Sequence, residues 1–339
     1  MQIREITAEK PVNGQFLILE NQLRVAKNGN AYLALKIGDP TGELPVKIWG
    51  ADEDLYQQLE VGRIISLEGI QPKKYRDQIQ LDWDGKNRLC FALVAENEVD
   101  YAKFLPHTPG NASEFWNYLS RIFGEIREPV LKMVLGYFFD DVAFRADFLR
   151  VPAALKRHHA YIGGLLEHTA GVVAMCDAAS SYYPMVNRDL LLAGAVLHDI
   201  GKVHTYHIGK TIEGTDAGKL IGHLVLGVEM VRRAFDGLAD PAAVSPQGIK
   251  IRNSLIHLLV SHHGVMEWGS PVEPLTLEAC ILHHADNMDA QVTKFLTVIR
   301  GHRSGGEWAA FDTGLGRSVY LGNYVASQVE MGSAEEDET

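Results

Sequence analysis

The sequence places a histidine and an aspartate side by side at the end of an apolar run. The stretch "LLLAGAVLHDIGKV" (190–203) is almost wholly apolar until His198 and Asp199, and Gly201 and Lys202 follow them. Burying an imidazole and a carboxylate costs free energy unless a partner binds them. A divalent metal ion is such a partner, because imidazole nitrogens and carboxylate oxygens are ligands for Mn, Fe, Zn or Mg ions.

Further candidate ligands recur on other apolar segments. Most of the 14 histidines lie in the second half of the chain, and the candidates are His168 in "GGLLEHT", His223 in "LIGHLVLG", His262 and His263 in "SHHG", and Asp286 in "HHADNMD". One such histidine alone is more often a hydrogen-bonded core residue. The recurrence of the whole set favours a shared metal site, because ligands from several helices can converge on a bundle core.

The elements that must position these residues differ between the two halves of the chain. Up to about residue 95, β-rich runs are broken by turn signals at Asn28-Gly29 and at residues 39–42. Three strands, a short helix at 51–60 and two more strands (63–70 and 77–83) follow the order of a five-stranded OB barrel. Another type of small β-barrel remains the alternative. From about Asn97 the apolar spacing becomes helical, and Pro129 is placed to begin a helix.

Composition excludes several classes of protein. The 339 residues carry a net charge of −11, which argues against indiscriminate coating of nucleic acid but allows a local basic groove. No apolar run approaches the roughly 20 residues that span a bilayer, and the first residues lack the apolar core of a signal peptide. The three cysteines form no CxxC pair, so we expect a cytoplasmic protein with inert thiols and no membrane partner.

The motif order resembles that of the HD-domain metal-dependent phosphohydrolases. Their pattern is a His, an adjacent His-Asp and a later Asp, which His168, His198, Asp199 and Asp286 match. The segments "HHAYIGGLLEHT", "LHDIGK", "GHLVLG", "SHHGVMEWGSP" and "LHHADNMDA", joined to an OB-type barrel, further resemble the YhaM-type 3'-to-5' exoribonucleases. Family members that cleave cyclic dinucleotides carry Gly-Tyr-Pro after the paired histidines. Here "GVMEWGSP" follows, which weighs against that activity.

The resemblance implies a fold, a domain order and a cofactor. We expect an OB-fold single-strand nucleic-acid-binding domain (1–95), a helical linker region (96–150), an all-α HD phosphohydrolase bundle (151–325) and an acidic, disordered tail (326–339). His223, with His262 or His263, would extend the basic set to a second metal. We expect two divalent ions, with Mn favoured and Fe, Co, Zn or Mg open.

Three further residues are candidates for catalysis. Lys202 follows Asp199 closely enough to offer a cation to a phosphate oxygen, although a lysine at a helix end also complements the helix dipole. His158 and His159 could contact substrate or protonate the leaving 3'-oxygen. A solvent-exposed pair at a helix start is the alternative.

The first half offers cations and rings for nucleic acid. An OB barrel binds single strands with a basic groove and stacking aromatic side chains. The candidates are Lys73, Lys74, Tyr75 and Arg76, with Tyr32 and Trp49 on earlier strands. Nearby aspartates dilute this basic segment, and a place in the barrel core is the alternative for Trp49.

A metal phosphohydrolase joined to a single-strand-binding barrel favours a polymeric substrate. We therefore expect 3'-to-5' hydrolysis of single-stranded RNA, with single-stranded DNA also open, to nucleoside 5'-monophosphates. One alternative is an HD phosphohydrolase of small nucleotides whose barrel mediates homo-oligomer contacts. Another is a nucleic-acid-binding protein without turnover.

Overall fold

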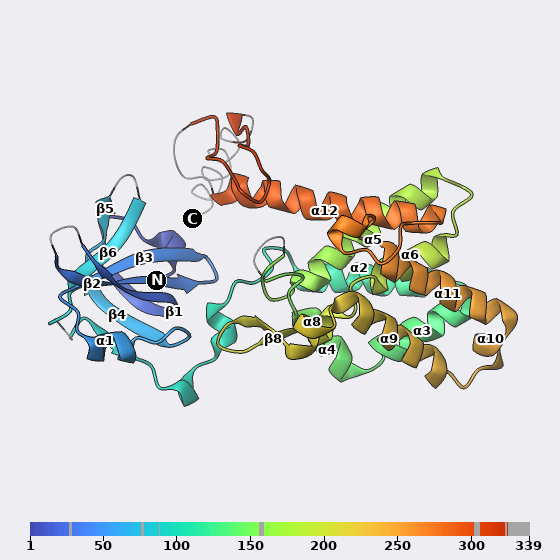
Figure 1. The fold of residues 1–339 in the computed structure, drawn as a ribbon, viewed down its shortest axis with the longest axis horizontal. Helices are drawn as coiled ribbons and strands as arrows, with labels where there is room; N and C mark the ends of the chain where they lie inside the picture. The colour runs from blue at the N-terminus through green and yellow to red at the C-terminus, as the bar shows by residue number, and fades with distance from the viewer. Residues whose placement is uncertain are drawn as a thin grey trace, which may run out of the picture. The chain divides into compact units, whose positions relative to one another are not determined.

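The computed structural model describes residues 1–26, 29–75, 78–87, 89–155, 159–301, 306–322 and 324 (Figure 1). Two compact units divide the chain: residues 1–107 with 208–213, and residues 108–207 with 214 onward. The candidates Arg76 and His158 and the tail 326–339 lie outside the described residues. The expected order, a β unit followed by a largely helical unit, is confirmed.

The first unit is a barrel-like mixed sheet. Its strands follow the order β5-β6-β3-β2-β1-β4-β7, so β5 and β7 are the ends of an unclosed sheet in the described chain. The bounds are β1 Val12–Val25, β2 Ala31–Asp39, β3 Gly42–Trp49, β4 Ile64–Ile70, β5 Lys73–Tyr75, β6 Gln78–Asp84 and β7 Phe91–Leu93. Helix α1 (Glu53–Gln58) lies between β3 and β4 in the chain, as predicted.

The sheet has seven strands where the sequence predicts five. The two additional strands, β5 and β7, have three residues each and are too short to show an alternating pattern. Pairing with β6 and β4 defines them. A register shift between Ile18 and Glu20 interrupts the long strand β1, which pairs with both β2 and β4. Strands β3 and β6 run parallel.

The second unit contains helices α2 to α12. The α-helices are α2 Ala112–Glu125, α3 Pro129–Phe139, α4 Val142–Arg150, α5 Gly164–Tyr182, α6 Arg188–Leu197, α7 Lys202–Thr205, α8 Asp216–Leu220, α9 His223–Gly237, α10 Pro241–Val244, α11 Pro246–Ser261 and α12 Leu277–Gly301. Strands β8 (Tyr206–Ile208) and β9 (Ile212–Gly214) pair as a short hairpin, whose residues 208–213 belong to the first unit, so the second half of the chain is not purely helical. The 3-10 helices are η1 Ile3–Glu5, η2 Glu96–Glu98, η3 Tyr101–Phe104 and η4 Met266–Trp268.

Helix α6 forms the centre of the helical core. Its residues from Leu190 to Leu197 are all buried, and the side chain of Asn187 caps its first turn. A Cβ on Gly194 would lie 2.2 Å from Cδ2 of Leu258, so the glycine allows α6 and α11 to approach closely. Pro129 begins α3, as predicted. No helix in the described part of the chain is long and apolar enough to cross a membrane.

Candidate metal centre

The candidate ligands lie at helix ends and on two long helices of the second unit. His198 ends α6, His223 begins α9 and His262 ends α11. His168 and Asp286 lie within α5 and α12. The apolar packing of these helices therefore fixes the positions of the polar side chains that follow or interrupt the apolar runs.

Gly201 brings two of these ends together. A Cβ on Gly201 would lie 2.1 Å from the carbonyl oxygen of His223 and 2.6 Å from the amide nitrogen of Gly227. Only a glycine lets the turn after Asp199 pack directly against the first turn of α9. As a result, Nε2 of His223 lies 3.3 Å from Oδ1 of Asp199.

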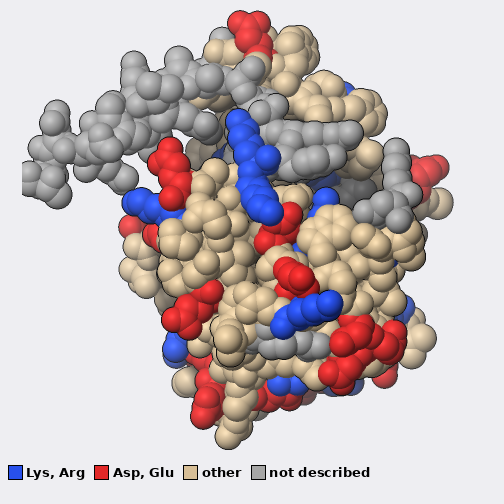
Figure 2. All heavy atoms as spheres, turned by 90° about the vertical axis from the view of Figure 1, so that its left-hand side faces the viewer, with Lys and Arg blue, Asp and Glu red and all other residues tan. Residues whose placement is uncertain are grey.

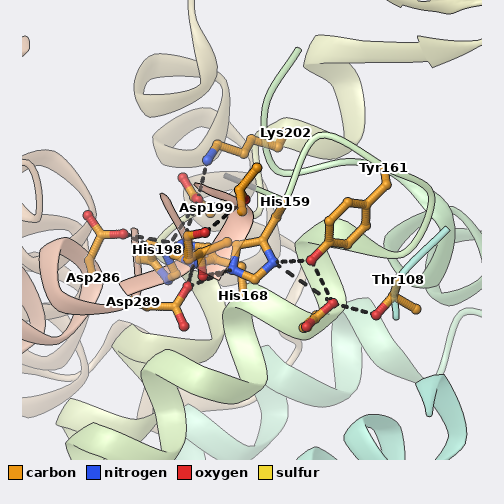
Figure 3. A network of polar contacts seen from close by, with 12 residues as sticks. Thr108, His159, Tyr161, His168, His198, Asp199, Lys202, Asp286 and Asp289 are labelled. Atoms are coloured by element: carbon orange, nitrogen blue, oxygen red, sulfur yellow. Dashed lines mark hydrogen bonds and ion pairs between the residues drawn. The ribbon is translucent and has the colours of Figure 1, made fainter. Parts of the chain in front are cut away.

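One cluster of ligand atoms surrounds Nε2 of His168. It lies 3.1 Å from Nε2 of His198, 3.4 Å from Oδ2 of Asp199 and 3.2 Å from Oδ1 of Asp286 (Figure 3). His168, His198 and Asp199 are at most 2% exposed. These four residues are the ones that match the basic HD pattern.

A second cluster lies on the other oxygen of Asp199. Nε2 of His262 lies 3.6 Å from Oδ1 of Asp199. The rings of His262 and His263 have centroids 4.5 Å apart, and those of His223 and His263 are 5.2 Å apart. Ligand atoms of His223, His262 and His263 all lie within 4.8 Å of one another. The carboxylate of Asp199 thus faces both clusters.

Hydrogen bonds to Nδ1 orient four of the rings. Three of the rings contact backbone carbonyl oxygens, which only accept, so Nδ1 of each ring is the donor. Nδ1 of His198 donates to the carbonyl of Ala195 (2.8 Å), that of His262 to Leu259 (2.7 Å) and that of His263 to Trp268 (2.9 Å). Nδ1 of His168 donates to Oδ2 of Asp289 at 2.7 Å. Each ring then leaves Nε2 as the available ligand atom, as is usual for histidines that bind metals.

The electrostatics suit a cation. Burial by itself raises the pKa of Asp199, but Lys202 and the neighbouring histidines hold that pKa well below its usual value. Burial lowers the pKa of His198, and it lowers the pKa of His223 to about 3. Burial also lowers the pKa of His168, but hydrogen bonds to three surrounding carboxylates raise it well above the ordinary value.

Two buried polar atoms of the site test whether a metal fits it. Oδ1 of Asp199 and Nε2 of His223 face each other, yet neither has a hydrogen-bond partner in the described part of the chain. Buried polar atoms without partners are rare in folded proteins. A divalent cation coordinated by these atoms would satisfy both, so the donor set fits the metal that the sequence predicts.

The structure places Lys202 in the centre and His159 beside it. Lys202 is 7% exposed and forms an ion pair with Oδ2 of Asp199. His159 is 3% exposed, and its ring nitrogens contact the hydroxyl of Tyr161 (2.8 Å) and Oδ2 of Asp289 (2.8 Å). Its φ of 53° is the one positive value at a non-glycine position among the described residues.

Asp289 is a site residue that the sequence interpretation missed. Its Oδ2 contacts both His168 and His159, and the network continues through Tyr161 to Glu167, which also accepts from Thr108 (Figure 3). Burial raises the pKa of Asp289, but hydrogen bonds with His159 and His168 bring it well below its ordinary value. The spacing of Asp286 and Asp289, three residues apart on one helix, was the available signal.

The nucleic-acid candidates lie on three strands of the first unit. Lys73, Lys74 and Tyr75 form β5, and Lys73 pairs with Asp82 at 2.6 Å. Tyr32 and Trp49 face each other across β2 and β3, with ring centroids 5.0 Å apart. Both rings are partly exposed. On the face shown in Figure 2, Lys and Arg side chains of the described residues are interspersed with Asp and Glu.

Comparison with known proteins supports this interpretation of the centre. The HD domain family model matches residues 165–291, which include all seven candidate metal ligands. The 3'-5' exoribonuclease YhaM of Listeria welshimeri is 33% identical over 307 residues, covering 90% of this chain and 93% of that protein. The enzyme of the same name from Listeria monocytogenes matches with the same identity and coverage. The chain is therefore a hydrolase with an HD domain, and it belongs to the YhaM family.

Proposed function

We propose that the protein is a metal-dependent 3'-to-5' exoribonuclease that hydrolyses single-stranded RNA to nucleoside 5'-monophosphates. The named activity of the relatives supports the reaction. The observation that carries the proposal is the position of Asp199, whose two oxygens face two separate sets of histidine Nε2 atoms. This arrangement is suited to a pair of metal ions acting on one phosphodiester.

We assign the candidate ligands to two sites that share Asp199. His168, His198 and Asp286 would hold one cation, and His223, His262 and His263 the other. Divalent ions bound there would lower the pKa of water and neutralise charge on the phosphate. Mn²⁺ is the first ion to test, and Fe, Co, Zn and Mg are alternatives with the same donor types.

The remaining residues hold this constellation in place. Lys202 keeps the buried carboxylate of Asp199 ionised and adds positive charge where a nonbridging phosphate oxygen would lie. Both ring nitrogens of His159 are engaged, so we assign it a positioning role through Asp289 rather than proton transfer to the leaving oxygen.

The first unit would bind the chain of the substrate. Three features are consistent with an OB-type barrel: β1 pairs with both β2 and β4, β3 and β6 run parallel, and helix α1 precedes β4. We propose that Lys73, Lys74, Tyr75 and Arg76 contact the sugar-phosphate backbone of the RNA and that Tyr32 and Trp49 stack on its bases.

The test uses chelator-treated protein, Mn²⁺ and a 5'-labelled single-stranded RNA. We expect a ladder that shortens from the 3' end, release of nucleoside 5'-monophosphates, and loss of both in Asp199→Asn and His198→Ala. RNA labelled at its 3' end should release its label in the first turnover. Single-stranded DNA of the same sequence measures the contribution of the 2'-hydroxyl.

Two results would replace the proposal. Hydrolysis of small nucleotides with no shortening of RNA would identify a nucleotide phosphohydrolase. Binding of the RNA without any metal-dependent cleavage would identify a nucleic-acid-binding protein without turnover.

A further inference from the structure

Residues 306–322 form a small module that follows α12 in the chain. Two backbone hydrogen bonds, from Ala309 N to Val319 O (2.9 Å) and from Leu321 N to Glu307 O (2.6 Å), hold its two arms antiparallel. The buried side chains of the module, Ala309, Leu315, Val319 and Leu321, pack against α12. The helix contributes Phe295, Val298 and Ile299 to this contact. These apolar contacts account for the folding of the module.

The large aromatic rings of the module are not part of that core. Trp308, Phe311 and Tyr320 are 61%, 65% and 43% exposed. Trp308 and Tyr320 pair directly across the arms with no hydrogen bond between them, the arrangement that brings side chains closest. Their ring centroids lie 5.1 Å apart. A Cβ on Gly322 would lie 2.3 Å from the hydroxyl oxygen of Tyr320, so the glycine leaves room for that ring.

Helix α12 links this module to the metal centre. The module packs on Phe295, Val298 and Ile299, which lie 9 to 13 residues beyond Asp286, or about 14–20 Å along the helix axis. Asp289 and Thr293, on the same helix, contact His159 beside the centre, so α12 carries contacts to both the centre and the module. The module follows the C-terminal end of α12 (Figure 1).

We propose that Trp308, Phe311 and Tyr320 form a stacking platform for bases of the single-stranded substrate, upstream of the nucleotide at the metal centre. This inference rests on the proposed function. Exposed rings stack on any base and therefore suit a nuclease that shortens RNA of varied sequence. About 14–20 Å corresponds to about four to six stacked nucleotides at 3.4 Å each, so only longer chains reach the platform.

Charge favours stacking as the source of affinity. The charged residues among 306–322 are Glu307, Asp312 and Arg317, whose charges nearly cancel. Affinity from the platform should therefore depend less on salt concentration than affinity from phosphate contacts does.

The test compares kcat and KM on a 4-nucleotide and a 16-nucleotide RNA with Mn²⁺. We expect Trp308→Ala and Tyr320→Ala each to raise KM for the 16-nucleotide RNA on the order of 10-fold and to leave its kcat unchanged. Both kcat and KM for the 4-nucleotide RNA should stay at the wild-type values. Trp308→Phe and Tyr320→Phe keep a ring and should remain close to wild type. Tyr182→Ala is the matched control, because Tyr182 and Tyr183 also form an exposed ring pair in the same unit.

The outcomes separate the two proposals. If wild type degrades RNA and both alanine variants keep the wild-type KM for the longer RNA, the platform is wrong and the exoribonuclease assignment stands. If wild type degrades no RNA, the exoribonuclease assignment fails. Fluorescence anisotropy of labelled 16-nucleotide RNA in EDTA still tests the platform in that case. Weaker RNA binding by the alanine variants than by wild type supports the platform, and equal binding overturns it. A changed sedimentation mass of the variants with unchanged KM would show a contact between protein chains, which also overturns it.

Discussion

Oδ2 of Asp289 lies 2.7 Å from Nδ1 of His168, and through this contact a residue outside the ligand set orients a candidate ligand. The carboxylate accepts the Nδ1 proton, so Nε2 of His168, which faces His198 and Asp286, is the atom that would bind a metal. The same oxygen contacts His159, whose backbone has a positive φ. An uncommon backbone conformation persists where surrounding contacts determine it.

Asp289→Asn should weaken metal binding without unfolding the protein. Substituting the carboxylate with an amide weakens its hold on the Nδ1 proton of His168, and loss of such a partner typically costs 10- to 100-fold in metal affinity. Titration of activity against buffered free Mn²⁺ measures the shift, and excess Mn²⁺ should restore turnover. Asp236→Asn, at an exposed position on α9, is the control. Equal Mn²⁺ dependence in wild type and Asp289→Asn would show that Asp289 does not support the ligand.

Lys202→Met should destabilise the metal-free protein more than the metal-loaded protein. Without Lys202 the buried carboxylate of Asp199 loses its ion-pair partner, and breaking a buried pair costs about 3–5 kcal/mol. Bound cations would compensate that charge, so Mn²⁺ should raise the melting temperature of Lys202→Met more than that of wild type. Thermal melts in EDTA and in Mn²⁺ measure both. The same loss of stability under the two conditions would contradict this role for the metal site.

The metal-free protein should lose stability as the pH falls below about 6.5. Burial lowers the pKa of His223 to about 3, so between pH 6.5 and 3 the unfolded chain binds a proton that the folded chain does not. Stability therefore rises with pH across that window, and His223 accounts for roughly 2 kcal/mol between pH 7.5 and 5. Melts of wild type and His223→Gln in EDTA should show a smaller decrease in the variant. Equal decreases would mean that His223 titrates normally in the folded protein.

Gly201→Ala should separate Asp199 from His223. The new Cβ would lie 2.1 Å from the carbonyl oxygen of His223, and backbone must move to relieve that contact. We expect a lower melting temperature and loss of metal from the cluster that contains His223. Gly124→Ala is the matched control, because a Cβ there meets no atom within 4 Å and alanine favours the helix by about 0.5–1 kcal/mol. A Gly201→Ala protein with wild-type stability and metal content would show that the turn has room to spare.

The candidate ligands could be found in the sequence because they interrupt apolar helices. His198 and Asp199 end a run whose every residue is buried, and only a specific partner compensates such a pair. The order of the β and helical halves could also be predicted, because the apolar residues have strand-like spacing in the first half and helical spacing in the second. Strands β5 and β7 could not be predicted, because three residues are too few to show an alternating apolar pattern. Only their pairing with β6 and β4 defines them.

The surroundings of the ligands depend on tertiary contacts and left little trace in the sequence. Asp289 contacts His159, 130 residues earlier in the chain, and no local pattern signals that contact. A solvent-exposed His159, one of the two alternatives that the sequence leaves open, is wrong, because the folded chain buries this ring against Asp289 and Tyr161. Lys202 sits close to Asp199 in sequence, but its burial follows from the packing of the turn around Gly201.

Metal stoichiometry tests the central claim, a carboxylate shared by two cations, most directly. Chelator-treated protein is equilibrated with Mn²⁺, desalted and analysed by elemental mass spectrometry beside Asp199→Ala and His263→Ala. We expect about two ions per wild-type chain, about one in His263→Ala, and fewer than one in Asp199→Ala. Two ions retained in Asp199→Ala, or one ion in wild type that His263→Ala leaves in place, would contradict it.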